Sequence, residues 1–299
     1  MRTFFVLAAL ALPGAIGAGG ELGAQRAPTT VRAGWPLSPN GAVKIHNLVG
    51  RVRVIGWERD SISVEGTIPA GLRFYGGGGL SGVKLAIEGE QHGPSSAAVL
   101  IVRVPATSKV AVRGAQTEIE AEGLTGPVDL ATVSGRLHVT GSPSDLLVET
   151  MDGDLTVIGS PGTMRARTAS GAFVWEGSAR EATITTVDGP VRITRGPLER
   201  ARIETVSGRV LLDLSLHPRG DVLVETHGGD IELVLGVAEP VRLSADAARV
   251  SGSGIAVSER VAGRPGEPRV IDLYARRGVV PTAHLTVRSF KGQVVVRAP

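Results

Sequence analysis

Apolar residues alternate with other residues over most of this chain, in a pattern that repeats about every 18 residues. Between residues 128 and 233, each copy has apolar residues at its first and third positions and Thr or an equivalent at its fifth. A Gly comes three residues after the Thr, usually preceded by Ser or Asp, and apolar residues return two and four positions after the Gly. The marker glycines are Gly135, Gly153, Gly171, Gly189, Gly208 and Gly229, spaced 18, 18, 18, 19 and 21 residues apart. Alternation with a period of two is typical of β-strands, so each copy predicts two short strands around a turn.

A unit of about 18 residues is too small to bury its own apolar row, whereas stacked units bury their rows against one another. The sequence therefore predicts an all-β fold, a right-handed, parallel β-helix-like solenoid with about 18-residue repeats. The parity of the strands places the Thr column inside, together with Phe173 and Trp175. We expect the Thr hydroxyls to bond turn amides. We also expect the marker glycines to need a positive φ.

The repeats extend from residue 40 to the end of the chain. Early and late copies contain Asn47 and Ser289 in the Thr slot. We interpret 40–299 as one solenoid domain with inserted loops near 74–81 and 258–268, preceded by a linker at 25–39. Residues 1–24 resemble an export signal peptide, because Arg2 precedes a nine-residue apolar run that Pro13 ends. That run is too short to span a bilayer as a helix, although a retained N-terminal anchor is the alternative.

The charge balance and the cysteine count narrow the functional classes. The chain has 32 Lys and Arg against 29 Asp and Glu, a net charge of +3, and no Cys. Charges of both signs are interspersed, so there is no electrostatic case for a nucleic-acid partner. We expect no disulfide, no transmembrane helix after signal cleavage, and an exported location: the periplasm, the outer surface or the medium.

Three stretches resemble the bacterial DUF4097 family of adhesin-like β-strand repeat proteins. They are residues 50–57 (GRVRVIGW) followed by Ile62 and Val64, residues 102–105 (VRVP) leading into Val110 and Val112, and the Thr-x-Ser/Asp-Gly turns from Thr132 to Gly208. The resemblance covers roughly residues 40–299. It implies a parallel β-helix-like fold and an envelope or exported setting. It implies no catalytic residues, because the family has no agreed active site.

Parallel β-helices also carry polysaccharide lyases and hydrolases, so the outward carboxylates are candidate catalytic groups. By parity, Glu204 and Glu225 are neighbours on the outside of the stack, without an evident partner acid, Lys or His, and Glu149 lies next to Arg167. Asp152 and Asp188 share a column but are two repeats apart, about 10 Å by strand spacing. We therefore predict no catalytic residue and interpret these carboxylates as a solvated face.

No metal or cofactor site is expected either. The six histidines, His46, His92, His138, His217, His227 and His284, have no ligand-like spacing, and no Cys supports them. The tripeptide Arg219-Gly220-Asp221 spells an integrin-binding sequence, but three-residue matches are common by chance.

The sequence thus favours an exported, non-catalytic, adhesin-like binding or scaffolding protein of the cell envelope. Its partner would be an envelope protein or a surface glycan. The alternative is a glycan-active enzyme of the lyase or hydrolase type on the same fold, and a third possibility is a rod that only spaces an envelope complex. The binding hypothesis predicts a surface stripe that is apolar or carries charges of one sign. The enzyme hypothesis predicts a groove with several ionisable residues, and the rod hypothesis predicts neither feature.

Overall fold

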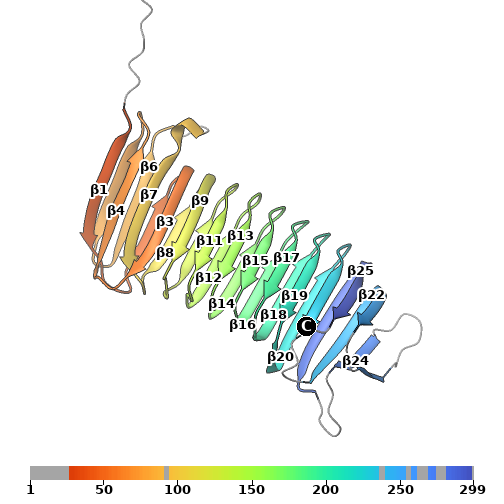
Figure 1. Ribbon diagram of the computed structural model, residues 1–299. Coiled ribbons are helices and arrows are strands. Elements are labelled where there is room, and N and C mark those ends of the chain that lie inside the picture. The colour runs from red at the N-terminus through yellow and green to blue at the C-terminus, as the bar shows by residue number, and fades with distance from the viewer. Residues whose placement is uncertain are drawn as a thin grey trace, which may run out of the picture.

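The fold is all-β and mostly parallel, and it forms an elongated stack (Figure 1). A computed structural model describes residues 27–90, 94–235, 240–253, 257–260, 269–273 and 281–297. Its 25 strands belong to one hydrogen-bonded sheet. Among the described residues, no helix is long and apolar enough to cross a membrane.

The strands are β1 (Thr29–Pro36), β2 (Ala42–His46), β3 (Val49–Trp57), β4 (Ser61–Ile68), β5 (Arg73–Gly79), β6 (Gly82–Glu88), β7 (Ala98–Pro105), β8 (Lys109–Arg113), β9 (Gln116–Glu122), β10 (Val128–Ala131), β11 (Leu137–Thr140), β12 (Asp145–Glu149), β13 (Leu155–Ile158), β14 (Thr163–Arg167), β15 (Phe173–Glu176), β16 (Ala179–Thr185), β17 (Val191–Thr194), β18 (Leu198–Thr205), β19 (Val210–Leu214), β20 (Leu216–Thr226), β21 (Ile231–Leu235), β22 (Val241–Ser253), β23 (Val257–Arg260), β24 (Arg269–Leu273) and β25 (Ala283–Arg297). A short 3-10 helix, η1, covers Pro94–Ser96.

In the body of the stack, each strand pairs in parallel with the strand that comes two places later in the chain. Val128 of β10 lies beside Leu146 of β12. Leu137 of β11 lies beside Leu155 of β13. Alternate strands therefore form two parallel ladders, and one strand from each ladder makes a rung of the stack.

The inward positions of both ladders are apolar and buried. Phe173 and Trp175 of β15 are 1% and 0% exposed, which confirms their predicted inward orientation. The Thr column is also buried, as predicted, and comprises Thr132, Thr150, Thr168, Thr186, Thr205 and Thr226. The hydroxyl of Thr205 accepts a hydrogen bond from Gly208 N at 3.0 Å, and Thr226 accepts one from Gly229 N at 2.8 Å. These hydroxyls therefore satisfy turn amides that the stack would otherwise leave unpaired.

The marker glycines are required for a different reason from the one expected. Of the six, only Gly135 has a φ in the left-handed region, at 139°. A Cβ on Gly153 would lie 2.1 Å from the carbonyl oxygen of Gly135, and the next turns repeat this contact. The column therefore consists of glycine because the backbones of successive turns approach too closely for any side chain. The positive φ values occur in a second column at the opposite turn, Gly141, Gly159, Gly177 and Gly196, at 139–153°.

At both ends, the spatial order of the rungs differs from their order in the chain. Strands β2 and β3 lie between β6 and β7 on one side and β8 and β9 on the other. The C-terminal strand β25 lies between β20 and β21 on one side and β22 on the other. Antiparallel strands complete each end: β4 pairs with β7, and β1 with β4, at the N-terminal end; β24 pairs with β22 at the other.

Two expectations about irregular segments need correction. The expected linker at 25–39 contains β1, which pairs antiparallel with β4 and buries Val31. The expected loop at 74–81 is mostly β5, which pairs antiparallel with β6. The glycines there serve packing, because a Cβ on Gly76 would lie 2.4 Å from Cη2 of Trp35 in β1. In the third segment, 258–260 belong to β23, whereas 261–268 and the expected signal peptide at 1–24 lie outside the described residues.

Candidate binding surface

Nine turn residues form a continuous column: six follow the members of the buried Thr column, and the other three follow Asn47, Gly114 and Ser289 at the equivalent turns. We call this column the turn ridge. It consists of Leu48, Ala115, Val133, Met151, Ala169, Val187, Val206, His227 and Phe290. Backbone hydrogen bonds join neighbouring members, as from Val133 N to Ala115 O and from Met151 N to Val133 O, both at 3.1 Å. The ridge is therefore held in register by the stack itself.

Most side chains of the turn ridge are apolar and face solvent. Exposed fractions are 49% for Leu48, 52% for Val133, 61% for Met151, 50% for Val187 and Val206, and 75% for Phe290. These are six of the ten large apolar side chains that are exposed among the described residues. Single exposed apolar residues are ordinary, but a contiguous exposed group of them marks an interaction site.

The turn ridge was missed from the sequence because the position after Thr was treated as unconstrained. The signal was present, since this position holds Val, Met, Ala, Val, Val and His in the six central copies. A turn position that contacts solvent has no packing reason to be apolar so often. The repeated apolar choice at one turn position is therefore a sequence signal for the ridge.

Polar residues flank the turn ridge on both sides. On one side are the turn residues Ser134, Asp152, Ser170, Asp188 and Ser207, and Ser170 Oγ donates to Asp152 Oδ1 at 3.0 Å. Ser170 lies between Asp152 and Asp188, as the sequence predicts, so the two carboxylates do not form a pair. On the other side, Arg167 Nη1 lies 3.2 Å from Glu149 Oε1, which confirms their predicted adjacency.

The carboxylate pair Glu204 and Glu225 is adjacent in the ladder, as predicted, and its partners are two arginines. Arg202 Nε donates to Glu204 Oε1 at 2.6 Å, and its Nη2 donates to Glu225 Oε2 at 3.0 Å. Arg288 Nη1 donates to the other oxygen of Glu225 at 3.1 Å. The hydrogen bond to Glu204, followed by the charges of Glu204 and Glu225, raises the pKa of Arg202. Three of the four carboxylate oxygens of this pair therefore accept hydrogen bonds from guanidinium groups.

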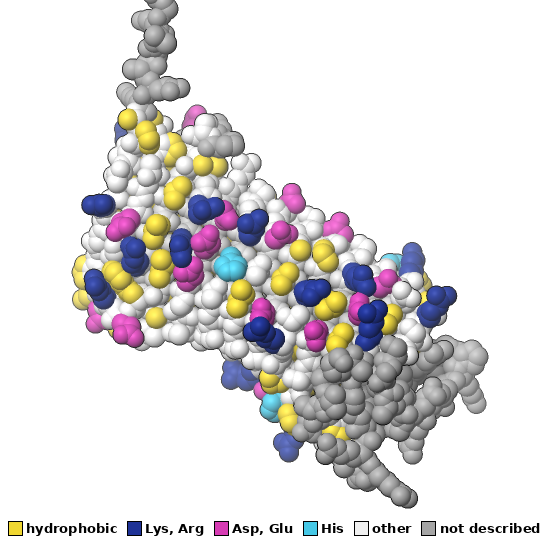
Figure 2. Space-filling view, viewed as in Figure 1, with side chains coloured by type: hydrophobic (Ala, Val, Ile, Leu, Met, Phe, Trp, Pro, Cys, Tyr) yellow, Lys and Arg dark blue, Asp and Glu magenta, His cyan; other side chains and the backbone are white. Residues whose placement is uncertain are grey.

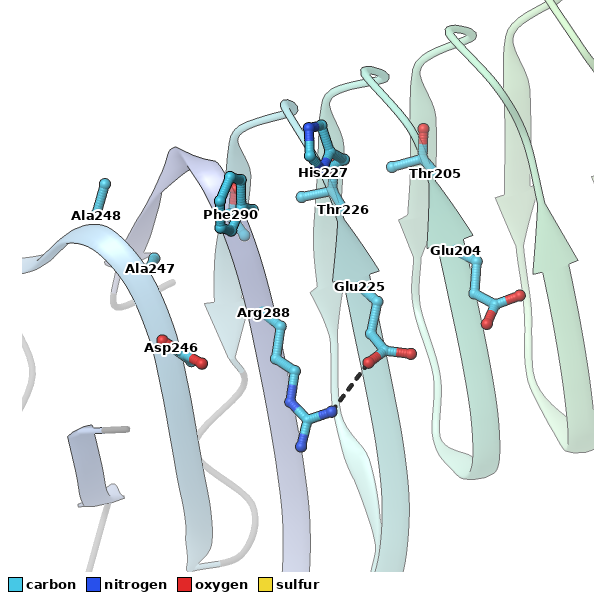
Figure 3. Close-up of a pocket in the computed structure, with 11 residues that line it drawn as sticks. Glu204, Thr205, Glu225, Thr226, His227, Asp246, Ala247, Ala248, Arg288 and Phe290 are labelled. Carbon is cyan, nitrogen blue, oxygen red and sulfur yellow. Dashed lines mark hydrogen bonds and ion pairs between the residues drawn. The ribbon is translucent and has the colours of Figure 1, made fainter. Parts of the chain in front are cut away.

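A hollow of about 830 Å³ opens beside these residues at the C-terminal end of the turn ridge. We call it the terminal groove. Its lining comprises Glu204, Thr205, Glu225, Thr226, His227, Asp246, Ala247, Ala248, Arg288, Ser289 and Phe290. Strands β18, β20, β25 and β22 supply these residues in that spatial order (Figure 3).

Other candidate chemistry is not brought together in the described part of the chain. No group of three His, Asp or Glu residues that could hold a metal ion occurs there. Arg219 and Asp221 of the tripeptide are exposed in β20, and Arg219 has a φ of 85°. The charged side chains of the segment at 258–268, those of Glu259, Arg260, Arg264 and Glu267, lie outside the described residues.

Comparison with known proteins gives a likeness of fold. No family model matches the chain. No curated protein matches it either. Solved structures similar to it include a candidate adhesin from Bacteroides fragilis, with 10% identity, a TM-score of 0.47, and coverage of 91% of this chain and 97% of that one. A candidate adhesin from Parabacteroides merdae has 11% identity, a TM-score of 0.47, and coverage of 90% and 95%. A candidate cell adhesion protein from Clostridium sporogenes has 11% identity, a TM-score of 0.25, and coverage of 91% and 100%. Because these values are low, the proposed function rests on the residues of this chain.

Proposed function

We propose that the protein is an exported, non-catalytic, adhesin-like binding or scaffolding protein of the cell envelope, and that the turn ridge is its binding surface. It would work in the periplasm, on the outer surface or in the medium, as a right-handed β-solenoid with about 18-residue repeats. The partner would be an envelope protein or a surface glycan.

The exposed apolar row of the turn ridge carries this proposal. Nine turns at the strand spacing make eight steps, or about 38 Å. Burying apolar surface contributes about 25 cal/mol per Å², so a partner lying along the row gains many small contributions. A rod that only spaces other components has no use for this row, because exposed apolar surface favours unspecific association.

The glycan-active alternative is weakened by the ion pairs around Glu204 and Glu225. Cleavage of a glycosidic bond requires an acid and a second carboxylate or water-activating base at one bond. Here Arg202 forms ion pairs with both carboxylates, and Arg288 forms one with Glu225. If the chain cleaves a polysaccharide and Glu204→Gln or Glu225→Gln abolishes this cleavage, the enzymatic alternative replaces the binding proposal.

The proposal is tested with a variant of the ridge and a matched control. The ridge variant combines Val133→Asp, Met151→Asp and Val187→Asp. The control variant combines Leu80→Asp, Val99→Asp and Ile158→Asp, which are also exposed apolar residues but lie off the ridge. Binding of each full chain to isolated envelopes of the producing cell is measured in a sedimentation assay. We expect the ridge variant to bind about tenfold more weakly, a loss of roughly 1.4 kcal/mol. We expect the control to bind as the unmodified chain does; equal binding by both variants would contradict the proposal.

A further inference from the structure

The turn ridge ends in the terminal groove. On the rung beyond Phe290, the positions beside the ridge hold the small residues Ala247 and Ala248, which leave this space unfilled. Along β22, Ala247 pairs with Ser289 of β25, and the register then shifts before Arg249. A bulge of this kind changes the direction of the strand and of its side chains. Ala248 is exposed beside the ridge, and the short side chains of Ala247 and Ala248 leave the hollow open (Figure 3).

The wall of the groove is aromatic. The rings of His227 and Phe290 are stacked, with centroids 5.1 Å apart and an interplanar angle of 18°. His227 covers one face of the Phe290 ring, and the next rung on the other side carries Ala247 and Ala248. Phe290 is 75% exposed, the highest fraction among the large apolar side chains described. The face of an aromatic ring is electron-rich, so it attracts the weakly positive C–H groups on one side of a pyranose ring.

The floor of the groove is polar. Glu225 holds Arg288 and Arg202 through its two oxygens. Ion-paired carboxylates keep lone pairs, and guanidinium groups keep N–H donors, for further hydrogen bonds. No ion pair of Asp246 occurs within the described residues. An apolar wall with a few fixed donors and acceptors is typical of sites for small ligands.

We propose that the terminal groove binds a saccharide unit that carries no acidic group. Hydroxyl groups fit the donors and acceptors of Glu225, Asp246 and Arg288, and the pyranose ring stacks on Phe290. The carboxylates of Glu204, Glu225 and Asp246 outnumber the guanidinium groups of Arg202 and Arg288, so the groove disfavours uronic acids and phosphates. This assignment is independent of the partner that the rest of the turn ridge contacts.

The test measures binding of three trisaccharides to the full chain by calorimetric titration and by ligand-observed NMR. The probes are chitotriose and cellotriose, which carry no acidic group, and trigalacturonate, which does. We expect saturable binding of at least one neutral trisaccharide, with trigalacturonate about tenfold weaker or not bound. Absence of binding by both neutral probes, or equally strong binding of trigalacturonate, would overturn the proposal.

Variants locate the binding in the groove. Phe290→Ala removes the stacking surface, and Ala248→Trp fills the hollow; each is expected to weaken binding of the neutral trisaccharide about tenfold or more. Ile158→Ala is the matched control, because Ile158 is an exposed apolar residue of β13 that lies outside both the terminal groove and the turn ridge. Phe290 and Ala248 are exposed, so these variants should fold, which thermal melting verifies. Unchanged affinity in either groove variant would refute the assignment.

Discussion

At the marker glycines, the backbones of successive turns lie so close together that no side chain fits between them. A Cβ on Gly171 would lie 1.9 Å from the carbonyl oxygen of Gly153, and one on Gly189 would lie 2.0 Å from that of Gly171. The contacting atom is a backbone oxygen that belongs to the stack and cannot rotate away. A side chain at any of these positions would therefore force two rungs apart.

For this reason, we expect Gly153→Val to lower the free energy of unfolding by about 3 kcal/mol. Thr156→Val, on the outward face of β13 three residues away, should change it by less than about 0.5 kcal/mol. Denaturant titration measures both values. Equal stabilities of the two variants would show that the turns can separate at no cost.

The Thr column permits a second test, because its hydroxyls are not equally satisfied. Thr205 Oγ1 donates to Val187 O at 3.3 Å and accepts from the amide of Gly208. In contrast, the buried Oγ1 of Thr168 has no hydrogen-bond partner among the described residues. A buried polar atom without a partner is costly, whereas removing one member of a made bond leaves the other unsatisfied.

We therefore expect opposite outcomes from the same substitution. Thr205→Val should destabilise the protein by about 1–3 kcal/mol, and Thr168→Val should be neutral or slightly stabilising. Thermal and denaturant unfolding of the two variants gives the comparison. A larger loss of stability from Thr168→Val than from Thr205→Val would mean that the Thr168 hydroxyl has a hydrogen-bond partner in solution.

Among the elements, β25 contributes more to the stack than its position at the end of the chain suggests. Its first half pairs with β20 and its second half with β21, while β22 pairs along its other edge. Terminal segments are usually peripheral and tolerate removal. Here, the terminal strand is an interior rung, so its loss would detach β22 and leave the edge of β20 unpaired.

We expect deletion of residues 281–299 to abolish cooperative unfolding of the C-terminal rungs and to cause aggregation. The matched control replaces residues 254–280 with a Gly/Ser segment of the same length, which removes β23 and β24 but keeps β25. Hydrogen exchange of β20 and β21 amides reports on both variants. Similar protection in the two would indicate that β25 is dispensable.

At the scale of the whole molecule, the described residues place opposite charges next to each other, whereas most exposed large apolar side chains lie together in the turn ridge. Glu118 lies between Arg51, at 2.6 Å, and Arg136, at 3.6 Å, and Glu225 lies between Arg202 and Arg288. Such exposed pairs contribute little to stability individually. Basic and acidic side chains are interleaved on the face shown in Figure 2. This face thus offers no field of one sign to a partner, and the turn ridge is the distinguishing feature among the described residues.

The sequence by itself determined the strand positions, the inward and outward faces, and the adjacency of outward residues in the regular part. Glu149 lies beside Arg167, and Thr168 is buried, because both follow from a period of two within strands and a fixed step between copies. The recurring turns in which Gly follows Thr by three residues, such as Thr205 and Gly208, were recognisable for the same reason. These are local properties of each repeat, and their recurrence in six successive copies makes a chance pattern untenable.

Only the tertiary structure decided which copies lie next to each other at the two ends. Every copy has nearly the same apolar face, so the pattern does not say that β25 lies between β20 and β22. It also does not say that Trp35 packs against Gly76, in a segment that the sequence suggests is a loop and that forms β5. The same holds for the terminal groove, which brings Glu204, Arg288 and Asp246 together across sequence separations that periodicity does not encode. Pairing of strands far apart in the chain depends on the free energy of the whole stack, in which long-range contacts compete with one another, and no single segment contains that information.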